Sequence, residues 1–285
     1  MNKIILFLRR VKRARIGHSL HLLGAWDSLL RSRLLQPILT QLPFRVDDVR
    51  MTLPPRYWGQ YILNEYEPVT RRSLDEHLHP GMTVVDVGAH VGFFASKAAR
   101  LVGPSGRVIA LEPSSENLPF LRRNTARNGS GNVVVHGIAA SGKTGRREFN
   151  ITGSSDSNGF YAHPLTHTVK TLEVETVRLD DLVDGPVDAV KIDVEGAELE
   201  VLDGMERLLR ESRQITLWVE WNPSCQREAG RPSNLLPHRL TELGFDVVAL
   251  DDHAGRVRPM SEVFAEVEAG VPDWWFVNLL ALREK

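Results

Sequence analysis

One stretch constrains the fold of this chain more than any other: an apolar run that ends in a glycine turn. Val84 to Val87 is predicted to be a short buried strand, because β-branched side chains dominate it. Gly88 ends the strand, Gly92 follows shortly after, and Phe93 to Leu101 is predicted to be a helix. A strand, a glycine turn and a helix N-terminus together bring free backbone N–H groups close to a ligand.

The following strand carries a second ligand signal. Arg107 to Leu111 is predicted to be a strand, and Glu112 stands at its end. A carboxylate at the tip of the second strand is placed to accept hydrogen bonds from both hydroxyls of a ribose. The glycine turn and this acid together predict a nucleoside-containing cofactor that lies across the carboxyl ends of a parallel sheet.

The glycine pattern favours S-adenosylmethionine (AdoMet) over a dinucleotide. The turn Gly88-Ala89-His90-Val91-Gly92 has fewer glycines than the G-x-G-x-x-G fingerprint, whose backbone approaches a pyrophosphate. Asp86, just before the turn, would repel a phosphate but suits the charged amino group or the sulfonium of AdoMet. Asp86 has a second interpretation, as a cap on the N–H groups of the turn, and both roles can hold together.

The rest of the chain predicts an α/β fold. The further elements expected are helices at about 116–128, 197–209 and 235–243, and strands at 132–136, 187–192, 214–219, 245–250 and 274–282. No helix is predicted between the last two strands, which suggests a reversed hairpin at the sheet edge. Between Arg147 and Arg178 the strand–helix rhythm gives way to an inserted β-excursion with a polar loop from Gly153 to Gly159. These elements predict a doubly wound, mostly parallel seven-stranded sheet with an antiparallel hairpin at its edge.

The length and the patterning divide the chain into two parts. Residues 1–65 are predicted to form an N-terminal helical extension with short strands, and residues 66–285 the cofactor-binding domain. The extension begins with many basic residues beside Ile4 to Leu8, an apolar run that is too short to span a membrane. It is interpreted as a helix that packs on the domain or on a second subunit. The alternative is a basic amphipathic helix that lies on an anionic membrane.

Composition limits the partners and the compartment. The formal net charge of −1 provides no global field that would recruit nucleic acid. Cys225 is the single cysteine, so no internal disulfide is possible and a cytoplasmic location is expected, peripheral to the membrane if the N-terminus binds lipid. Cys225 has no paired histidine motif and is not expected to be a nucleophile. His163 lacks metal-ligand spacing and is interpreted as a surface or hydrogen-bonded residue.

Acidic residues gather at the predicted ligand edge of the sheet. Asp86, Glu112, Asp193, Glu195 and Glu220 all fall at or next to the carboxyl ends of predicted core strands. A structural sheet seldom places so many acids there without a ligand. Asp193 has an alternative interpretation, as the cap of the helix that begins near Ala197.

Four motifs extend this pattern beyond a generic cofactor fold. They are Asp86-Val-Gly-Ala-His-Val-Gly, Ala110-Leu-Glu-Pro, the Asn-Gly pair at Asn128 and, most specifically, Lys191-Ile-Asp-Val-Glu-Gly-Ala-Glu. With these motifs the chain resembles the FkbM family of AdoMet-dependent methyltransferases, from about Tyr66 to Trp221. His90 departs from the family pattern, in which asparagine is commoner at that position.

The resemblance implies a class I methyltransferase fold, AdoMet as cofactor and O-methylation. The acceptor that it implies is a small-molecule or glycan hydroxyl, often on a sugar of a glycan, a glycolipid or a glycosylated natural product. The residues expected to bind the cofactor are Asp86, Gly88, Ala89, His90, Gly92, Glu112, Pro113, Ala139, Tyr66 and Glu67. A non-catalytic AdoMet-binding scaffold and an NAD-dependent oxidoreductase are the alternatives. The intact acids argue against the first, and the glycine pattern argues against the second.

Methyl transfer to an alcohol needs alignment and a base. The sulfonium is already activated, whereas the hydroxyl has a high pKa and benefits from a general base or a metal ion. Asp193 is the best-placed base by position, and Glu195 and Glu220 are further candidates. A Mg2+ ion held by Asp193, Glu220 and Asn222 is a less favoured alternative, because no third carboxylate is evident from the sequence.

Overall fold

The computed structural model describes residues 43–54, 57, 61 and 66–283. The chain divides into two compact units, Met1–Pro68 and Val69–Lys285, and each is described by itself. The helical extension predicted for the first 42 residues lies outside the described part, and the predicted boundary between residues 65 and 66 stays a prediction.

The first unit contains a short antiparallel hairpin. Strand β1 (Phe44–Val46) pairs with β2 (Val49–Met51), and Phe44 lies opposite Met51. Both strands alternate buried and exposed side chains, the period-two pattern of a half-buried strand. Asp47, in the turn, has a φ of 55°, a conformation that aspartate tolerates better than most residues. The short strands predicted for this part of the chain are therefore present.

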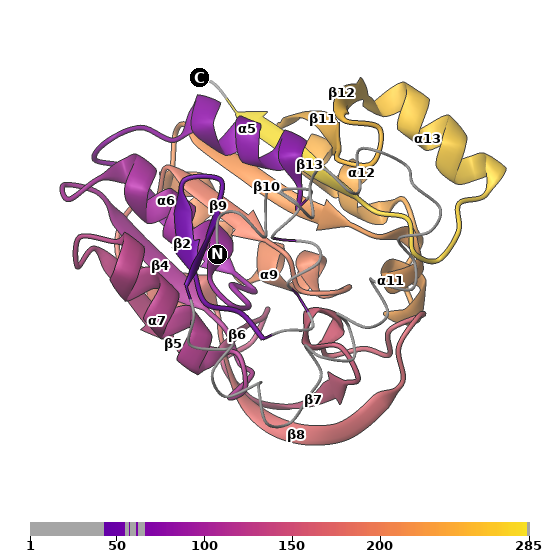
Figure 1. Ribbon diagram of the computed structural model, residues 1–285. Helices are drawn as coiled ribbons and strands as arrows, with labels where there is room; N and C mark the ends of the chain where they lie inside the picture. The colour runs from indigo at the N-terminus through magenta and orange to yellow at the C-terminus, as the bar shows by residue number, and fades with distance from the viewer. Residues whose placement is uncertain (1–42, 55–56, 58–60, 62–65, 284–285) are drawn as a thin grey trace, which may run out of the picture. The chain divides into compact units, whose positions relative to one another are not determined.

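The second unit is built on a sheet of eight described strands (Figure 1). Their order is β12-β11-β13-β10-β9-β3-β4-β5. The bounds are β3 Thr83–Val87, β4 Arg107–Leu111, β5 Val133–His136, β9 Ala189–Ile192, β10 Ile215–Trp221, β11 Asp246–Asp251, β12 Arg256–Pro259 and β13 Val277–Arg283. Strands β5, β4, β3, β9 and β10 are all parallel neighbours. The chain reverses its direction of progress between β3 and β9, and doubly wound sheets bind ligands at such a switch point.

The central strands of this sheet are buried on both faces. In β3 the last four residues are buried, and in β9 all four are. Val85, Val190 and Val219, on three neighbouring strands, are completely buried in one continuous core. Parallel strands covered by helices read as apolar runs of this kind, which is why the sequence located them. The predicted doubly wound α/β fold is confirmed.

The end of the sheet differs in detail from the prediction. Strand β13 lies between β10 and β11 and is antiparallel to both, with Leu279 opposite Val219 on one side and Ala249 on the other. Strand β12 and helix α13 (Met260–Ala269) precede it, so the prediction of no helix between the last strands was wrong. Val263 is the only fully buried residue of α13, and a helix with so little apolar surface leaves a weak periodic signal. The edge hairpin is formed by β11 and β12, which adds an eighth strand.

The predicted excursion is a separate three-stranded sheet in the order β6-β8-β7. Strand β7 (Gly145–Thr152) pairs antiparallel with β8 (Thr168–Val177), and β6 (Ala139–Ala140) runs parallel to β8. The loop after β7 contains a short 3-10 turn, η3 (Ser155–Ser157). The alternating, largely polar sequence of β8 matches its mostly exposed surface.

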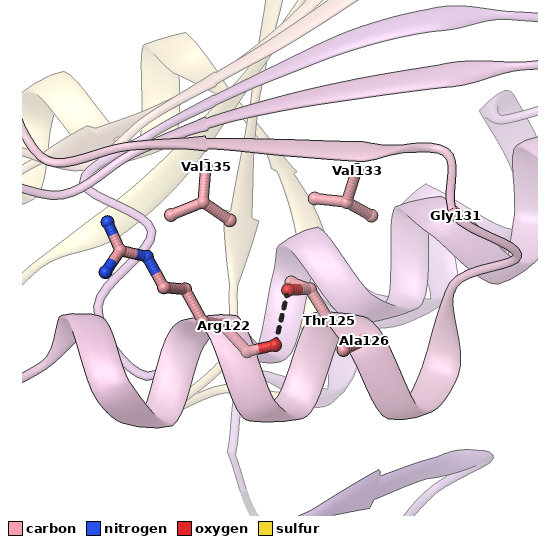
Figure 2. A pocket seen from close by; sticks show the side chains of 6 residues that line it. All are labelled: Arg122, Thr125, Ala126, Gly131, Val133 and Val135. Atoms are coloured by element: carbon pink, nitrogen blue, oxygen red, sulfur yellow. Dashed lines mark hydrogen bonds between the residues drawn. The ribbon is translucent and has the colours of Figure 1, made fainter.

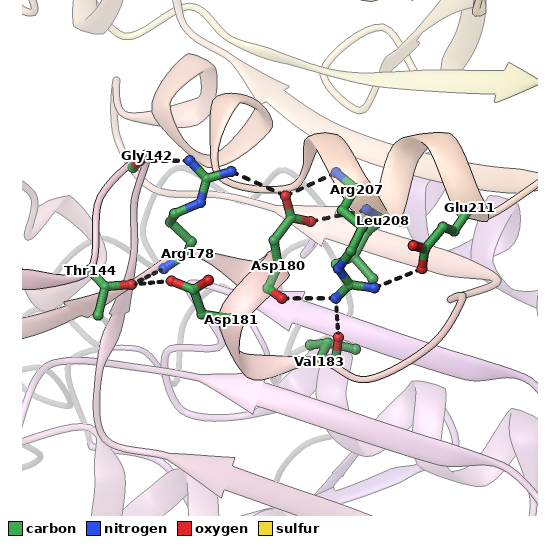
Figure 3. Close-up of polar contacts among 9 residues, drawn as sticks. All are labelled: Gly142, Thr144, Arg178, Asp180, Asp181, Val183, Arg207, Leu208 and Glu211. Carbon is green, nitrogen blue, oxygen red and sulfur yellow. Dashed lines mark hydrogen bonds and ion pairs between the residues drawn. The ribbon is translucent and has the colours of Figure 1, made fainter.

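Asp180 anchors the base of the excursion to the larger sheet (Figure 3). It lies in α8 (Leu179–Leu182), and its carboxylate accepts from the backbone N–H groups of Arg207 and Leu208, at the start of α10 (Glu206–Glu211). The Arg178 side chain donates to the same carboxylate at 3.2 Å and reaches toward the Gly142 carbonyl. One acid therefore caps a helix and connects it, through Arg178, to the segment between β6 and β7.

The remaining helices flank the sheet. They are α5 (Pro68–His77), α6 (Phe93–Val102), α7 (Leu118–Asn128), α9 (Glu198–Asp203), α11 (Pro223–Glu228) and α12 (Leu235–Glu242). The single helix predicted over 197–209 is broken into α9 and α10 at Gly204, a poor helix former. Among the described residues, no helix combines the length and the apolar character needed to cross a membrane.

Candidate active site

The glycine turn is locked between two strands. The N–H groups of Gly88 and Ala89 both donate to the Leu111 carbonyl of β4, at 3.0 and 2.9 Å. Gly88 has a φ of 80°, and a Cβ atom there would lie 1.8 Å from the backbone oxygen of Asp193. Only glycine allows this approach, so the turn following β3 is forced against the segment that follows β9. The predicted cofactor turn is thus held at the switch point of the sheet.

Glu112 supports the turn from the neighbouring strand. Its Oε2 accepts from the His90 N–H at 2.8 Å, and its Oε1 accepts from the Ser114 N–H at 2.9 Å and from the Asn117 side chain at 3.2 Å. Burial raises the pKa of this carboxyl to about 7, although the three hydrogen bonds act in the opposite direction. A carboxylate has about four acceptor positions, so capacity remains for a ribose hydroxyl.

Asp86 and Lys191 are buried neighbours on adjacent strands, below the turn. The two residues are paired across β3 and β9, and the Lys191 ammonium lies 2.6 Å from Asp193 Oδ2 and over the ring of Phe94. Burial raises the pKa of Asp86 to about 6, and the charge of Lys191 lowers it in part. Asp86 Oδ2 is buried without a hydrogen-bond partner in the described structure. An orphaned buried acceptor requires a donor, which the ammonium of AdoMet would provide.

Asp193 does not cap the helix that follows it. The N-cap position of α9 is Ala197, and no side chain caps the helix there. The Asp193 carboxylate instead pairs with Lys191, and about a fifth of its side chain is exposed. The alternative interpretation of Asp193 as a helix cap is therefore wrong, because the carboxylate faces the buried lysine of its own strand.

Glu195 has a strained backbone and a crowded carboxylate. Its φ is 52°, in the left-handed region that non-glycine residues rarely adopt. Oε2 lies 3.5 Å from His163 Nε2 and accepts from the Cys225 thiol at 3.4 Å. Burial raises the pKa of the Glu195 carboxyl, and the nearby charge of Asp193 adds to the effect. Strain of this kind persists where the surrounding structure dictates it, and it clusters at functional sites.

Three carboxylates meet at the ends of β9 and β10. Oxygen atoms of Asp193, Glu195 and Glu220 lie within 4.8 Å of one another. The third acid that the sequence did not make evident is therefore Glu195. Asn222 is occupied elsewhere, because its side-chain oxygen accepts from the N–H groups of Ser224 and Cys225 and caps α11. The magnesium site predicted from Asp193, Glu220 and Asn222 is therefore not formed. The short distances among the three carboxylates are the one feature that favours a hard cation here.

The excursion reaches both halves of this site. His90, in the cofactor turn, has its Nε2 3.0 Å from the hydroxyl of Ser155 in η3. Gly159, at the other end of the polar loop, lies against Glu195 so closely that a Cβ would be 3.3 Å from the Glu195 Cβ. The loop that the sequence singled out is therefore in contact with the turn and with the acidic cluster.

The other predicted cofactor residues take no part in the contacts described above for the second unit. Pro113 follows Glu112 at the end of β4, and Ala139 is buried in β6 of the smaller sheet. Tyr66 and Glu67 belong to the first unit, where the Tyr66 ring stacks on that of Tyr61 with centroids 4.2 Å apart. Their role in cofactor binding stays a prediction.

Sequence reasoning missed three participants. Lys191 appeared only as part of a motif, although a lysine inside a buried strand is itself a signal. His163 and Cys225 carried no local signal, because they come from the excursion and from α11 and meet Glu195 only in the folded chain.

A separate hollow lies at the outer edge of the sheet, between α7 and β5 (Figure 2). Its volume is about 350 Å³, and Val133 and Val135 of β5 face Thr125 and Ala126 of α7 across it. None of the residues that line this hollow was predicted to bind the cofactor or to act in catalysis. The candidate active site therefore consists of the glycine turn and the acidic residues described above.

Known proteins resemble this chain over the region that contains the site. Residues 86–247, more than half of the chain, match the family described as Methyltransferase FkbM domain. The chain is 29% identical to Methyltransferase sdnD of Sordaria araneosa over 197 residues, which cover 58% of this chain and 73% of that protein. It is 26% identical to Hexuronic acid methyltransferase AglP of Haloferax volcanii over 196 residues, covering 65% and 75%. The crystal structure of Methyltransferase FkbM from Methylobacillus flagellatus KT has a TM-score of 0.43 and 18% identity, over 80% of this chain and 53% of that one.

Proposed function

The chain belongs to the FkbM methyltransferase family, and from this premise we propose that it transfers a methyl group from AdoMet to a sugar hydroxyl. The sugar would be part of a glycan, a glycolipid or a glycosylated natural product. The observation that carries the proposal is the combination, at one switch point, of a glycine turn, an orphaned buried acid and a strand-end acid. That combination suits a ligand with both a positive charge and a ribose.

Two acids account for the proposed cofactor site. Asp86 Oδ2 is a buried acceptor without a donor, and it would accept from the ammonium group of AdoMet. Glu112 fixes the turn through the His90 N–H and keeps acceptor capacity for a ribose hydroxyl. The fit is poor for NAD, because Asp86, next to the turn, would repel a negatively charged pyrophosphate.

A sugar acceptor is supported by one relative and by the chemistry of the acidic cluster. AglP is a hexuronic acid methyltransferase by name, and the chain spans three quarters of its length. Carboxylates accept hydrogen bonds from neighbouring hydroxyls, so three of them within 4.8 Å suit a polyhydroxylated ligand. This part of the proposal names the acceptor class and leaves the methylated hydroxyl open.

When bound, AdoMet would supply an activated methyl group. The protein's part is to align the acceptor oxygen with the S–CH3 bond, exclude water and accept the hydroxyl proton. Asp193 Oδ2 is engaged by the Lys191 ammonium at 2.6 Å. Glu195 receives the imidazole and the thiol at Oε2, which leaves Oε1 for the acceptor, and it is therefore the stronger candidate to take the proton. Glu195 would accept the proton of the acceptor hydroxyl as that oxygen takes the methyl group, and S-adenosylhomocysteine would be the leaving group.

The test is a methylation assay with the full-length protein. AdoMet carrying a deuterated methyl group would be offered with a panel of hydroxylated glycans and uronic acids, and products would be examined by mass spectrometry. A deuteromethyl ether on a sugar is the expected result. Transfer to nitrogen or carbon acceptors only would overturn the O-methyl assignment. Thermal stabilisation by AdoMet without any transfer would favour the scaffold alternative, and stabilisation by NAD alone would favour an oxidoreductase.

A further inference from the structure

The loop after β7 brings a histidine against the acidic cluster. His163 Nε2 lies 3.5 Å from Glu195 Oε2, and only 9% of the His163 side chain is exposed. The two residues belong to different parts of the fold, since His163 lies in the excursion and Glu195 follows β9 of the larger sheet. The role of this largely buried imidazole depends on which of its ring nitrogens carries a proton.

The second contact of the His163 ring fixes where its proton lies. The backbone N–H of Leu165 donates to His163 Nδ1 at 3.2 Å. A ring nitrogen that accepts a hydrogen bond carries no proton, so the neutral ring has its proton on Nε2. Nε2 is the atom that faces Glu195. The contact is therefore an N–H donor directed at a carboxylate, and His163 has no ring nitrogen left to act as a base.

The segment that carries His163 is held on both sides. Asn150 of β7 and Gly159 exchange backbone hydrogen bonds at 2.8 and 3.2 Å. The Tyr161 hydroxyl donates to the Glu200 carboxylate of α9, and the Arg231 guanidinium joins the same carboxylate at 2.9 Å. Arg231 also donates to the Gly196 carbonyl at 2.9 Å, immediately after Glu195. These anchors couple the position of the excursion loop to the backbone that presents Glu195.

A second donor reaches Glu195 from another element. The Cys225 thiol, in the first turn of α11, donates to the same Oε2 at 3.4 Å. Glu198 accepts from the Gly196 N–H at 3.0 Å and holds the strained backbone next to Glu195. Both side-chain donors thus converge on one oxygen of Glu195, and the other oxygen, Oε1, takes part in neither contact.

A metal ion is the competing explanation for this cluster. The ligand atoms of His163, Glu195 and Cys225 lie within 4.8 Å of one another, which by spacing alone would suit zinc. The chemistry argues otherwise, because His163 Nε2 bears its proton while Leu165 occupies Nδ1. Burial raises the pKa of the Cys225 thiol above its usual range, so in the metal-free protein the thiol acts as a hydrogen-bond donor. The cluster is a carboxylate with two donors.

We propose that His163 is a positioning residue that orients Glu195 for the methyl transfer. Its Nε2–H, together with the Cys225 thiol, holds Oε2 and leaves Oε1 directed at the acceptor hydroxyl. The proposal rests on the proposed function, and it gives the inserted excursion a part in the chemistry. The separation of 3.5 Å is long for a hydrogen bond, and catalytic hydrogen bonds in ligand-free sites commonly tighten when the substrate binds.

Kinetics of three variants test the positioning role. His163→Ala is expected to lower kcat about 10- to 100-fold, because a misplaced catalytic group costs that much, with the AdoMet dissociation constant unchanged. His163→Gln retains an N–H donor at a similar distance and should recover most of the rate. His167→Ala, an exposed histidine of the same loop, is the matched control and should match the wild type. Wild-type kcat in His163→Ala, or no recovery in His163→Gln, would overturn the proposal.

A spectroscopic measurement separates this proposal from the proposed function. In protein labelled with 15N-histidine, His163 is expected to show the Nε2–H form at neutral pH, with slow exchange of that proton. Glu195→Ala should accelerate the exchange, because the acceptor is lost. A proton on Nδ1, or exchange that Glu195→Ala leaves unchanged, would overturn the proposal whether or not the protein methylates sugars. Stoichiometric zinc binding that His163→Ala abolishes would instead assign the cluster to a metal.

Discussion

At the scale of single residues, the buried carboxyl of Glu112 should make AdoMet binding sensitive to pH. Its pKa is raised by burial to about 7 from an ordinary 4.5, so it is largely protonated in the ligand-free protein at pH 6. Ribose hydroxyls donate to the ionised form. AdoMet affinity should therefore rise as the pH increases from about 6 to 8 and level off above the folded-state pKa. Calorimetry across this range measures the effect.

Glu112→Gln should reduce that pH dependence, and the part that remains at lower pH is expected from Asp86, whose pKa burial raises to about 6. Hydrogen bonds to a charged group contribute about 1.5–3 kcal/mol, so at pH 8 the affinity for AdoMet should fall at least about tenfold. Glu116→Gln removes an exposed carboxylate from the same segment and should leave the affinity unchanged. A folded Glu112→Gln protein that binds as tightly as the wild type at both pH values would exclude Glu112 from the cofactor site.

The two candidate bases can be separated by their different partners. Glu195→Gln should lower kcat by about 10²–10⁴-fold, the usual contribution of a general base, and leave AdoMet binding intact. Asp193→Asn removes the carboxylate charge beside the Lys191 ammonium, whose charge also acts on Asp86, and should therefore weaken AdoMet binding as well. Steady-state kinetics and calorimetry on both variants give the comparison. Full kcat in Glu195→Gln together with a large loss in Asp193→Asn would return the base assignment to Asp193.

At the scale of elements, the turn after β3 depends on the absence of a single Cβ. In Gly88→Ala the left-handed backbone destabilises the fold by about 1–2 kcal/mol, and the new Cβ would also lie 1.8 Å from the Asp193 backbone oxygen. In Gly103→Ala, where φ is 65° and no atom lies within 4 Å of the Cβ, the left-handed backbone is the single source of destabilisation. Chemical denaturation should show Gly88→Ala to be less stable than Gly103→Ala by about 1–3 kcal/mol. Equal stabilities would mean that the two strand ends can separate at no cost.

Asp180 tests how firmly the excursion is attached. Asp180→Ala removes the acceptor for two N–H groups of α10 and the partner of Arg178, and should cost about 1.5–3 kcal/mol of folding free energy. Asp181→Ala, the neighbouring exposed acid bonded to Thr144, should change stability by less than about 0.5 kcal/mol. Urea denaturation measures both variants. If they behave alike, the contacts of Figure 3 add nothing to the stability of the fold.

At the scale of the whole molecule, the N-terminal segment should be dispensable for the cofactor. All of the contacts assigned above to the cofactor site lie between residues 86 and 195, so removal of residues 1–42 should leave the AdoMet dissociation constant unchanged. Calorimetry and sedimentation with anionic vesicles would be run on both forms. A truncated protein that does not fold would assign the segment to a core or a subunit interface. One that folds but no longer sediments with vesicles would favour the membrane interpretation.

The sequence by itself determined the parallel core strands and the glycine turn. Val84 to Val87 and Gly88 are read correctly from β3 and its end, and Glu112 is placed correctly at the end of β4, because periodicity, glycine conformation and strand-end placement are local properties. The cofactor role of Glu112 stays a prediction. Only the tertiary structure decided that β13 lies between β10 and β11, and that Glu195 is enclosed by His163 and Cys225. Those contacts join segments far apart in the chain. They follow from how the excursion and α11 pack on the strand ends, and no local pattern encodes that packing.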